Sequence, residues 1–176
     1  ECLIIIDACR RSMAKTITLI MPCFAYARQD KKDESRAPIS AKLIANLLEK
    51  AGIDRLVVMD LHASQIQGFF DIPVDNIYSF PLISQYLSNN YFKNMDLNVI
   101  QKKYILVAPD AGAIKRTLKF AKLMHLNAIF MHKQRNYEIA NTVDNMMIVG
   151  NPEHIWNKTA IILDDMCDTG GTLIKC

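Results

Sequence analysis

Near its C-terminal end the chain reads AIILDDMCDTGGT (residues 160–172), a stretch that indicates a parallel α/β fold. An apolar run typical of a buried strand, 160–163, leads directly into Asp164, Asp165 and a Thr-Gly-Gly-Thr turn at 169–172 that opens a helix. Open parallel sheets bind ligands at the carboxyl ends of their strands, where carboxylates suit the vicinal hydroxyls of a ribose. The glycines let backbone N–H groups approach a phosphate. The stretch predicts a sugar-phosphate site; the alternative is an ordinary turn with Asp as helix cap.

The rest of the chain alternates short β-rich runs with amphipathic stretches, in the order of a parallel α/β fold. A helix is expected from Pro38 to Ala51, with Gly52 closing it, and two more over 81–91 and 113–124. The apolar face expected for the first helix consists of Ile39, Leu43, Ile44, Leu47 and Leu48. The expected strands are Ile17–Met21, Leu56–Met59, Tyr104–Ala108, Ala128–Met131, Met146–Val149 and Ala160–Leu163.

Two domains are expected. A Pro-containing turn at 71–75 precedes a break near Ser79, which divides the predicted strands into residues 1–78 and 79–176. The polar stretch 89–103 is expected to be a loop. Because the first residues already have helical spacing and the last ones only begin a helix, both domains are expected to be incomplete, in an excerpt of a longer protein.

Composition narrows the class of protein. With 176 residues, 51% of them hydrophobic, the chain can bury a core. A formal charge of +3 without a run of like charges implies neither nucleic-acid nor membrane binding, and the apolar run 3–6 is too short to span a bilayer. Five cysteines without a C-x-x-C spacing argue against a disulfide framework or a zinc site. A reducing, cytoplasmic location is therefore expected.

Two polar motifs lie in the first half of the chain. Arg28 and Gln29 belong to a charged segment before a helix, where Arg28 could bind a polyphosphate, although a solvated loop is the commoner reason for such a cluster. Asp60 and His62 end a predicted strand, and alternate residues of a strand share a face. Both could therefore meet one ligand; a hydrogen-bonded structural histidine is the alternative.

Two more polar motifs lie in the second half. Asp110 precedes a glycine turn and a helix, where it could bind a ligand, cap the helix, or do both. Lys133 and Arg135 follow the strand ending at Met131 and open a polar stretch that is expected to be a mobile loop. Without further information a surface loop is the simplest interpretation of these two basic residues.

Together, and in this order, the motifs resemble those of the ribose-phosphate diphosphokinases (phosphoribosyl-pyrophosphate synthetases) over nearly the whole chain. The sugar loop also occurs in plain phosphoribosyltransferases, but the Arg28-Gln29 segment and VMDLHASQIQGFFDIPVD (58–75) do not. The resemblance implies two phosphoribosyltransferase-like (type I) lobes with mainly parallel sheets, the first on the side of ATP and Mg²⁺ and the second on the side of ribose 5-phosphate. Ala25 and Ala113 depart from it, since the family usually has glycine at both positions.

The resemblance also implies roles for individual residues. Lys133 and Arg135 would be catalytic, closing over the phosphates, and Arg28 and Gln29 would contact ATP. The implied magnesium ligands, direct or through water, are His62, Asp110, Asp60, Asp71 and Asp75. The residues implied to bind ribose 5-phosphate are Asp164, Asp165, Asp168, Thr169, Gly170, Gly171 and Thr172.

The implied reaction transfers the diphosphoryl group of Mg-ATP to the 1-hydroxyl of ribose 5-phosphate, giving 5-phosphoribosyl 1-diphosphate and AMP for nucleotide biosynthesis. Members of the family usually form dimer-based hexamers, so a homo-oligomer is expected, with no nucleic-acid or membrane partner. Two alternatives stay open. One is a phosphoribosyltransferase; the other is a non-catalytic regulatory relative, against which the intact sugar loop argues.

Overall fold

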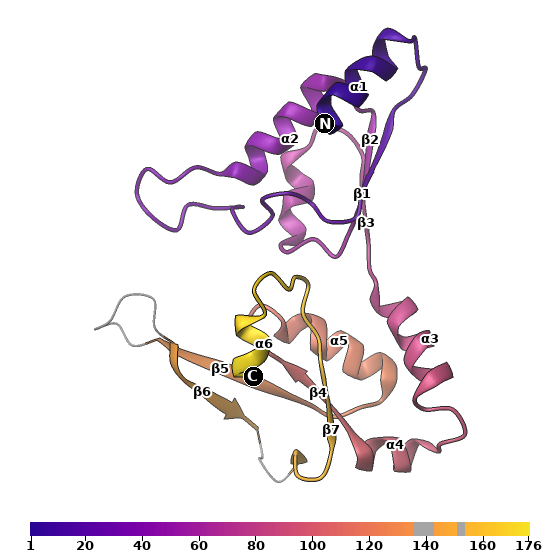
Figure 1. The fold of residues 1–176 in the computed structure, drawn as a ribbon, viewed down its shortest axis with the longest axis vertical. Helices are drawn as coiled ribbons and strands as arrows, with labels where there is room; N and C mark the ends of the chain where they lie inside the picture. The colour runs from indigo at the N-terminus through magenta and orange to yellow at the C-terminus, as the bar shows by residue number, and fades with distance from the viewer. Residues whose placement is uncertain (136–142, 151–153) are drawn as a thin grey trace. The chain divides into compact units, whose positions relative to one another are not determined.

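A computed structural model describes residues 1–135, 143–150 and 154–176 of the chain, without the side chains of 133–135 and 143–146. The chain divides into two compact units, Glu1–Ser79 and Phe80–Cys176 (Figure 1). Each unit has its own sheet and its own buried core. In the part of the chain that the structure describes, no helix combines the length and the apolar character that a membrane crossing requires.

The first unit is built on a three-stranded parallel sheet. Its elements are α1 (Cys2–Arg11), β1 (Thr18–Met21), α2 (Ser40–Ala51), β2 (Arg55–Met59), the 3₁₀ helix η1 (Ser64–Phe69) and β3 (Val74–Ile77). The strand order is β1-β2-β3, and both neighbouring pairs are parallel. The central strand β2 buries Leu56 and Val58, which are 0% and 1% exposed. They share one apolar core with Ile66 of η1.

Local sequence signals set the boundaries of α2. The helix begins at Ser40, two residues after Pro38, and ends before Gly52. Gly52 adopts a left-handed φ of 108°, and its N–H donates to the carbonyls of Leu48 and Glu49 at 3.2 and 3.0 Å. Glycine is favoured there because a Cβ is poorly tolerated at such a φ.

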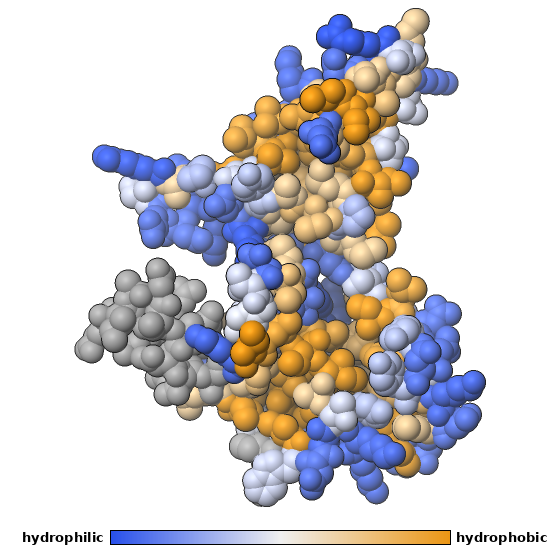
Figure 2. Space-filling view, viewed as in Figure 1, coloured by the Kyte–Doolittle hydropathy of each residue, from blue (hydrophilic) through white to orange (hydrophobic). Residues whose placement is uncertain are grey.

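The buried face of α2 matches the predicted one only in part. Leu48 is buried and Ile44 packs against the core, as predicted. Leu43 and Leu47 are instead 56% and 41% exposed, while Ala41 and Ala45 are buried. Small alanine side chains let the helix approach the core closely. The buried face of the helix is therefore set by its contact with the core and not by which apolar side chains are largest. Figure 2 shows the apolar surface that this choice leaves over α1 and α2.

The second unit is built on a four-stranded mixed sheet. Its elements are α3 (Phe80–Asn90), α4 (Leu97–Lys103), β4 (Tyr104–Ala108), α5 (Ile114–Met124), β5 (Ala128–Arg135), β6 (Val143–Val149), β7 (Thr159–Ile162) and α6 (Gly171–Lys175). The strand order is β6-β5-β4-β7. Strand β4 runs parallel to both β5 and β7, and β6 is antiparallel to β5. The predicted α/β class with mainly parallel sheets is confirmed.

Strand β4 forms the centre of the second unit. Leu106 packs with Phe120 of α5, and both are 0% exposed. Ile105 and Val107 point to the opposite face, where they pack with Ile129 of β5. A strand that is buried on both faces has a continuous apolar sequence, as β4 does. This strand is therefore fixed firmly enough to position the turn that follows it.

Each predicted strand is present, but several elements differ from the prediction. Strand β3 begins inside the predicted turn 71–75 and continues to Ile77. Helix α4 forms in the predicted loop, where Asp96 accepts a hydrogen bond from the N–H of Val99 at 2.9 Å and so caps the helix. Strand β5 continues past Met131 to Arg135 because its backbone pairs with β6. The predicted mobile loop therefore does not begin at 132.

Thr117 on α5 provides a test of core packing. Its side chain is 0% exposed, and its Oγ1 has no hydrogen-bond partner among the described residues. Valine has the same shape without the hydroxyl, so Thr117→Val should raise the free energy of unfolding by about 1 kcal/mol in urea denaturation. Phe120→Ala, which removes a large side chain from the core of the second unit, should lower the free energy of unfolding by about 3–5 kcal/mol. A clear loss of stability in Thr117→Val would contradict the prediction.

Candidate functional site

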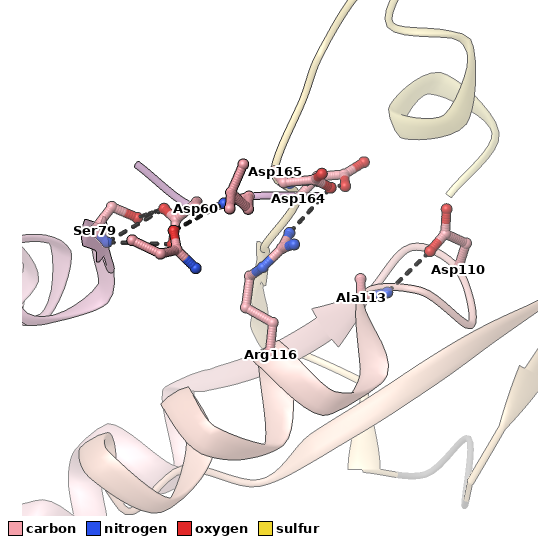
Figure 3. Close-up of polar contacts among 9 residues, drawn as sticks. Asp60, Ser79, Asp110, Ala113, Arg116, Asp164 and Asp165 are labelled. Carbon is pink, nitrogen blue, oxygen red and sulfur yellow. Dashed lines mark hydrogen bonds and ion pairs between the residues drawn. The ribbon is translucent and has the colours of Figure 1, made fainter. Parts of the chain in front are cut away.

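In the second unit, the candidate site lies at the carboxyl ends of β4 and β7. These strands pair in parallel, so their carboxyl ends lie at the same edge of the sheet. The N–H of Leu163 donates to the carbonyl of Val107 at 3.2 Å, which carries the pairing one residue beyond β7. Asp110 follows β4, and Asp164 and Asp165 follow β7 (Figure 3). Strand pairing thus gathers carboxylates that are far apart in the sequence.

Asp110 fixes the turn that leads into α5. Its Oδ1 accepts a hydrogen bond from the N–H of Ala113 at 3.0 Å. A Cβ on Gly112 would lie 3.2 Å from the same oxygen, so glycine suits this tight turn. Ala113 has an ordinary helical φ of −79° and its side chain is 2% exposed. Alanine in place of a second glycine is therefore accommodated without backbone strain.

Arg116 holds the carboxylate of Asp165. It extends from α5 toward the end of β7, where its Nη1 lies 3.1 Å from Asp165 Oδ1 (Figure 3). The Asp165 side chain is 9% exposed and that of Arg116 is 22% exposed. Removing one partner of a buried ion pair typically costs about 3–5 kcal/mol, and the exposure of Arg116 places this pair below that range. The sequence prediction missed Arg116, because nothing local to α5 indicates its partner.

Asp164 lies in an unfavourable electrostatic position for a charged carboxylate. Its Oδ1 accepts a hydrogen bond from the backbone N–H of Asp165 at 2.9 Å. Burial raises the pKa of the Asp164 carboxyl above its ordinary value, and the side-chain hydrogen bond with Asp165 and the negative charges of Asp165 and Asp110 raise it further. A cation or a hydrogen-bond donor that entered this cluster would relieve the repulsion.

The Thr-Gly-Gly-Thr turn follows in the same unit. Gly170 adopts a left-handed φ of 73°, which favours glycine. The Oγ1 of Thr169 accepts a hydrogen bond from the N–H of Gly171 at 3.4 Å, so this side chain closes the turn. Asp168 and Thr169 are exposed, and Thr172 is partly exposed in the short helix α6. The turn is therefore accessible to a ligand in the unit described.

In the first unit, Asp60 lies where β2 ends. Its carboxylate accepts hydrogen bonds from the backbone N–H of Ser79, at 3.2 and 3.3 Å, and from the Ser79 hydroxyl. Its φ of 46° is left-handed, a conformation that is uncommon for a residue other than glycine. The expectation that Asp60 and His62 share a strand face is therefore wrong, because the strand ends at Met59 and the chain turns at Asp60.

Of the other residues predicted near His62, Asp75 has an ion-pair partner and Asp71 is held through its backbone. Asp75 lies on β3, where Nε of Arg55 contacts its Oδ2 at 2.5 Å; this hydrogen bond and charge hold the pKa of Asp75 below its usual value. The backbone N–H of Asp71 donates to Oε1 of Glu49 at 2.5 Å. Among the described residues, no group of three or more His, Cys, Asp or Glu side chains could hold a metal.

Arg28 and Gln29 are exposed on a segment whose ends are fixed. Buried Phe24 attaches the segment to the core through an edge-to-face contact with Phe70, with ring centroids 5.8 Å apart. The carbonyl of Gln29 accepts the N–H of Ala41 at 3.1 Å, which joins the segment to the start of α2. These contacts hold the backbone and leave both side chains on the surface.

The neighbouring departure from the family, Ala25, does not lie at the position that needs conformational freedom. In this turn the left-handed residue is Tyr26, with a φ of 59°. Oδ2 of Asp30 accepts a hydrogen bond from Nε2 of Gln65 at 3.0 Å, which ties the far side of the segment to η1. Alanine at position 25 is thus compatible with the observed backbone.

Lys133 and Arg135 lie on β5, where their backbones pair with Met146 and Val143 of β6. Their side chains, and the continuation of the predicted loop at 136–142, lie outside the described residues. Their catalytic assignment therefore stays a prediction. The same holds for the ATP, magnesium and ribose 5-phosphate assignments of the other predicted residues.

Comparison with known proteins adds independent information. Residues 1–52 match the model of a family described as the N-terminal domain of ribose phosphate pyrophosphokinase. The chain is 49% identical over 175 residues to ribose-phosphate pyrophosphokinase A of Dictyostelium discoideum, covering 99% of this chain and 51% of that protein. It is 50% identical over 176 residues to ribose-phosphate pyrophosphokinase 4 of Saccharomyces cerevisiae, covering 99% and 50%.

A solved structure gives the same result. The crystal structure of phosphoribosylpyrophosphate synthetase from Mycobacterium smegmatis matches with a TM-score of 0.81 at 42% sequence identity, covering 97% of this chain and 51% of that one. The chain spans about half the length of the curated relatives that it matches.

Parallel sheets with polar side chains at the ends of their strands define an α/β protein of the open-sheet, ligand-binding class. Over nearly all of its own length, the chain is similar to proteins named ribose-phosphate pyrophosphokinase. The resemblance inferred from the motifs is confirmed.

The raised pKa of Asp164 predicts a dependence of stability on pH. Because burial raises that pKa in the folded state, the folded chain holds more protons than the unfolded chain between the two pKa values, and stability falls as pH rises through this window. Asp164→Asn removes the titrating group. Its gain in melting temperature over the original protein should therefore grow as pH rises from about 4, the ordinary aspartate pKa, toward neutrality.

Asp168→Asn, which removes one charge from an exposed position of the same loop, is the control for net charge. A difference between Asp164→Asn and the original protein that stayed constant with pH, or shrank as pH rose, would refute the assigned direction. Melting should be followed by circular dichroism across pH 4 to 8.

Proposed function

We propose that the complete protein carrying this sequence is a ribose-phosphate diphosphokinase. It would transfer the diphosphoryl group of Mg-ATP to the 1-hydroxyl of ribose 5-phosphate, giving 5-phosphoribosyl 1-diphosphate and AMP. The observation that carries the proposal is strand β7, which leads into Asp164, Asp165 and the Thr-Gly-Gly-Thr turn. About 50% identity to relatives named ribose-phosphate pyrophosphokinase supports it.

The second unit would bind the acceptor. Asp164 and Asp165 would accept hydrogen bonds from the ribose hydroxyls, and the turn from Asp168 to Thr172 would hold the 5-phosphate through backbone N–H groups and hydroxyls. Two features support this assignment: the turn is accessible, and Gly170 adopts a φ that glycine favours. A sugar hydroxyl that donates to Asp164 would also stabilise the charged form of this crowded carboxylate.

The first unit would bind the nucleotide. Arg28 and Gln29 are exposed on a segment whose backbone is held at Phe24 and at the start of α2, so a ligand would pay little to order that backbone. Arginine suits phosphate because its planar fork offers several donors. The Asp60 turn, held by Ser79, would fix the residues that follow it, including His62.

Magnesium would enter with ATP. It prefers oxygen ligands and usually takes one or two carboxylates together with substrate phosphates, so a group of three protein ligands is not required. Asp110 fits this chemistry best, because its charge lies close enough to Asp164 to add to the rise in that carboxyl's pKa, after burial and the hydrogen bond and charge of Asp165, and a cation would offset this repulsion. His62, Asp60, Asp71 and Asp75 remain further candidates. Bound magnesium would offset the charge of the diphosphate.

The protein would contribute mainly position and charge, because the nucleophile and the leaving group belong to the substrates. The oxygen of the ribose 1-hydroxyl forms a bond to the β-phosphorus of ATP. The bond between that phosphorus and the bridging oxygen of AMP breaks, and the hydroxyl proton passes to solvent. Lys133 and Arg135 would offset the negative charge that develops around the β-phosphorus.

The assembly and location follow from the family resemblance. The complete protein is proposed to be a homo-oligomer, namely a hexamer built from dimers. It is proposed to be cytoplasmic and to have no nucleic-acid or membrane partner. Exposed apolar side chains on the first unit, such as Ile4 and Ile5 at 74% and 62%, support burial of that surface against further protein.

The direct test is an assay on the complete protein with ATP, Mg²⁺ and ribose 5-phosphate. The proposed function requires AMP and 5-phosphoribosyl 1-diphosphate to appear in equal amounts, and neither should form without ribose 5-phosphate. Consumption of 5-phosphoribosyl 1-diphosphate in the presence of a nucleobase, without AMP release from ATP, would instead identify a phosphoribosyltransferase. Absence of both reactions in a folded protein would favour a regulatory relative.

Lys133→Ala tests the proposed catalytic group. Loss of a charge-stabilising donor typically slows turnover about 10²- to 10³-fold, so kcat should fall by that amount while ribose 5-phosphate binding, measured by calorimetry, changes little. Lys103→Ala at the exposed end of α4 removes an equal charge from the same unit and should leave kcat unchanged. Near-normal turnover in Lys133→Ala would exclude the assigned role.

A further inference from the structure

The carboxylates after β7 are not equivalent. Asp165 is 9% exposed and is paired with Arg116 at 3.1 Å. Asp164 is partly exposed, and its Oδ1 accepts a hydrogen bond from the backbone N–H of Asp165 at 2.9 Å. A nearly buried carboxylate that already holds a guanidinium offers little surface to a ligand. Asp165 is therefore less suited than Asp164 to contact a ligand directly.

Arg116 is well placed to determine this difference. It lies on the first turn of α5, whose Thr117 and Phe120 are fully buried, so its backbone is fixed relative to β4. The turn before α5 is closed by Asp110 through the N–H of Ala113. The guanidinium thus reaches the end of β7 from a rigid base, and this contact joins α5 to the loop that follows β7.

We propose that Arg116 is a positioning residue of the acceptor site: it holds Asp165, and through the Asp165 backbone it orients Asp164, which then meets the sugar hydroxyls. This inference rests on the proposed function and deepens it. In this proposal Asp165 mainly connects Arg116 of α5 to Asp164, and Asp164 contacts the sugar. The family resemblance, in contrast, gives both carboxylates the same role. Arg116 itself need not touch the substrate.

The arrangement has a specific consequence for binding. If Arg116 acts only through Asp165, removing either side chain breaks the same link, so the effects of the two substitutions should not add. Ribose 5-phosphate binding should weaken, and ATP binding should not, because the link from Arg116 through Asp165 to Asp164 includes none of the residues proposed to contact ATP or magnesium. A general loss of stability would instead weaken the binding of both substrates alike.

The test is a double-mutant cycle in the complete protein with Arg116→Met, Asp165→Asn and both together. Arg116→Met should raise KM for ribose 5-phosphate about 10-fold and leave KM for ATP within about 2-fold. The double variant should be no worse than the more affected single variant. Arg116→Lys should recover part of the loss because it restores the charge without the planar fork. Lys115→Met, an exposed neighbour on α5, should match the original protein.

Direct calorimetry with ribose 5-phosphate separates this inference from the proposed function. If the original protein releases no AMP, the proposed function fails, yet the same cycle can be completed on binding constants alone. Additive effects of Arg116→Met and Asp165→Asn, an equal rise in both KM values, or unchanged ribose 5-phosphate binding would each overturn the positioning role. Should Arg116→Met fail to fold, the cycle is run with Arg116→Gln, which also removes the charge, and the same outcomes decide.

Discussion

The parallel pairing of β4 with β7 is the constraint on which the candidate site depends. Strand β4 is buried on both faces, between Phe120 of α5 and Ile129 of β5, so its position is set by the core of the second unit. Strand β7 takes its register from β4. Backbone hydrogen bonds alone therefore bring Asp110, Asp164 and Asp165 to one edge of the sheet.

Charge at that edge is kept unbalanced. Carboxylates from two strand ends gather there, and of these Asp165 has Arg116 as a partner, while burial and neighbouring negative charge raise the pKa of Asp164. Such an arrangement is poor for stability, and carboxyl groups with perturbed pKa values are typical of functional sites. The backbone at Asp60 is likewise in an unfavourable state: its φ is left-handed, and hydrogen bonds from Ser79 stabilise it.

Positions that depart from the family pattern are explained by local geometry. Ala113 lies in ordinary helical conformation with its methyl group buried, whereas Gly112 has little room for a Cβ next to Asp110. Tyr26, and not Ala25, takes the left-handed conformation in the segment before Arg28. A substitution from glycine is tolerated where φ is negative and space is available, and the sequence alone states neither condition.

The sequence by itself determined the α/β class, the strands other than β3 and the order of the motifs, because apolar periodicity and glycine turns are local signals. It also carried the family resemblance. Only the tertiary structure decided that β5 runs to Arg135, that α2 buries alanines in place of Leu43 and Leu47, and that Asp60 leaves the strand. It alone paired Arg116 with Asp165. Such contacts depend on strand register and helix packing between distant segments, which no local pattern encodes.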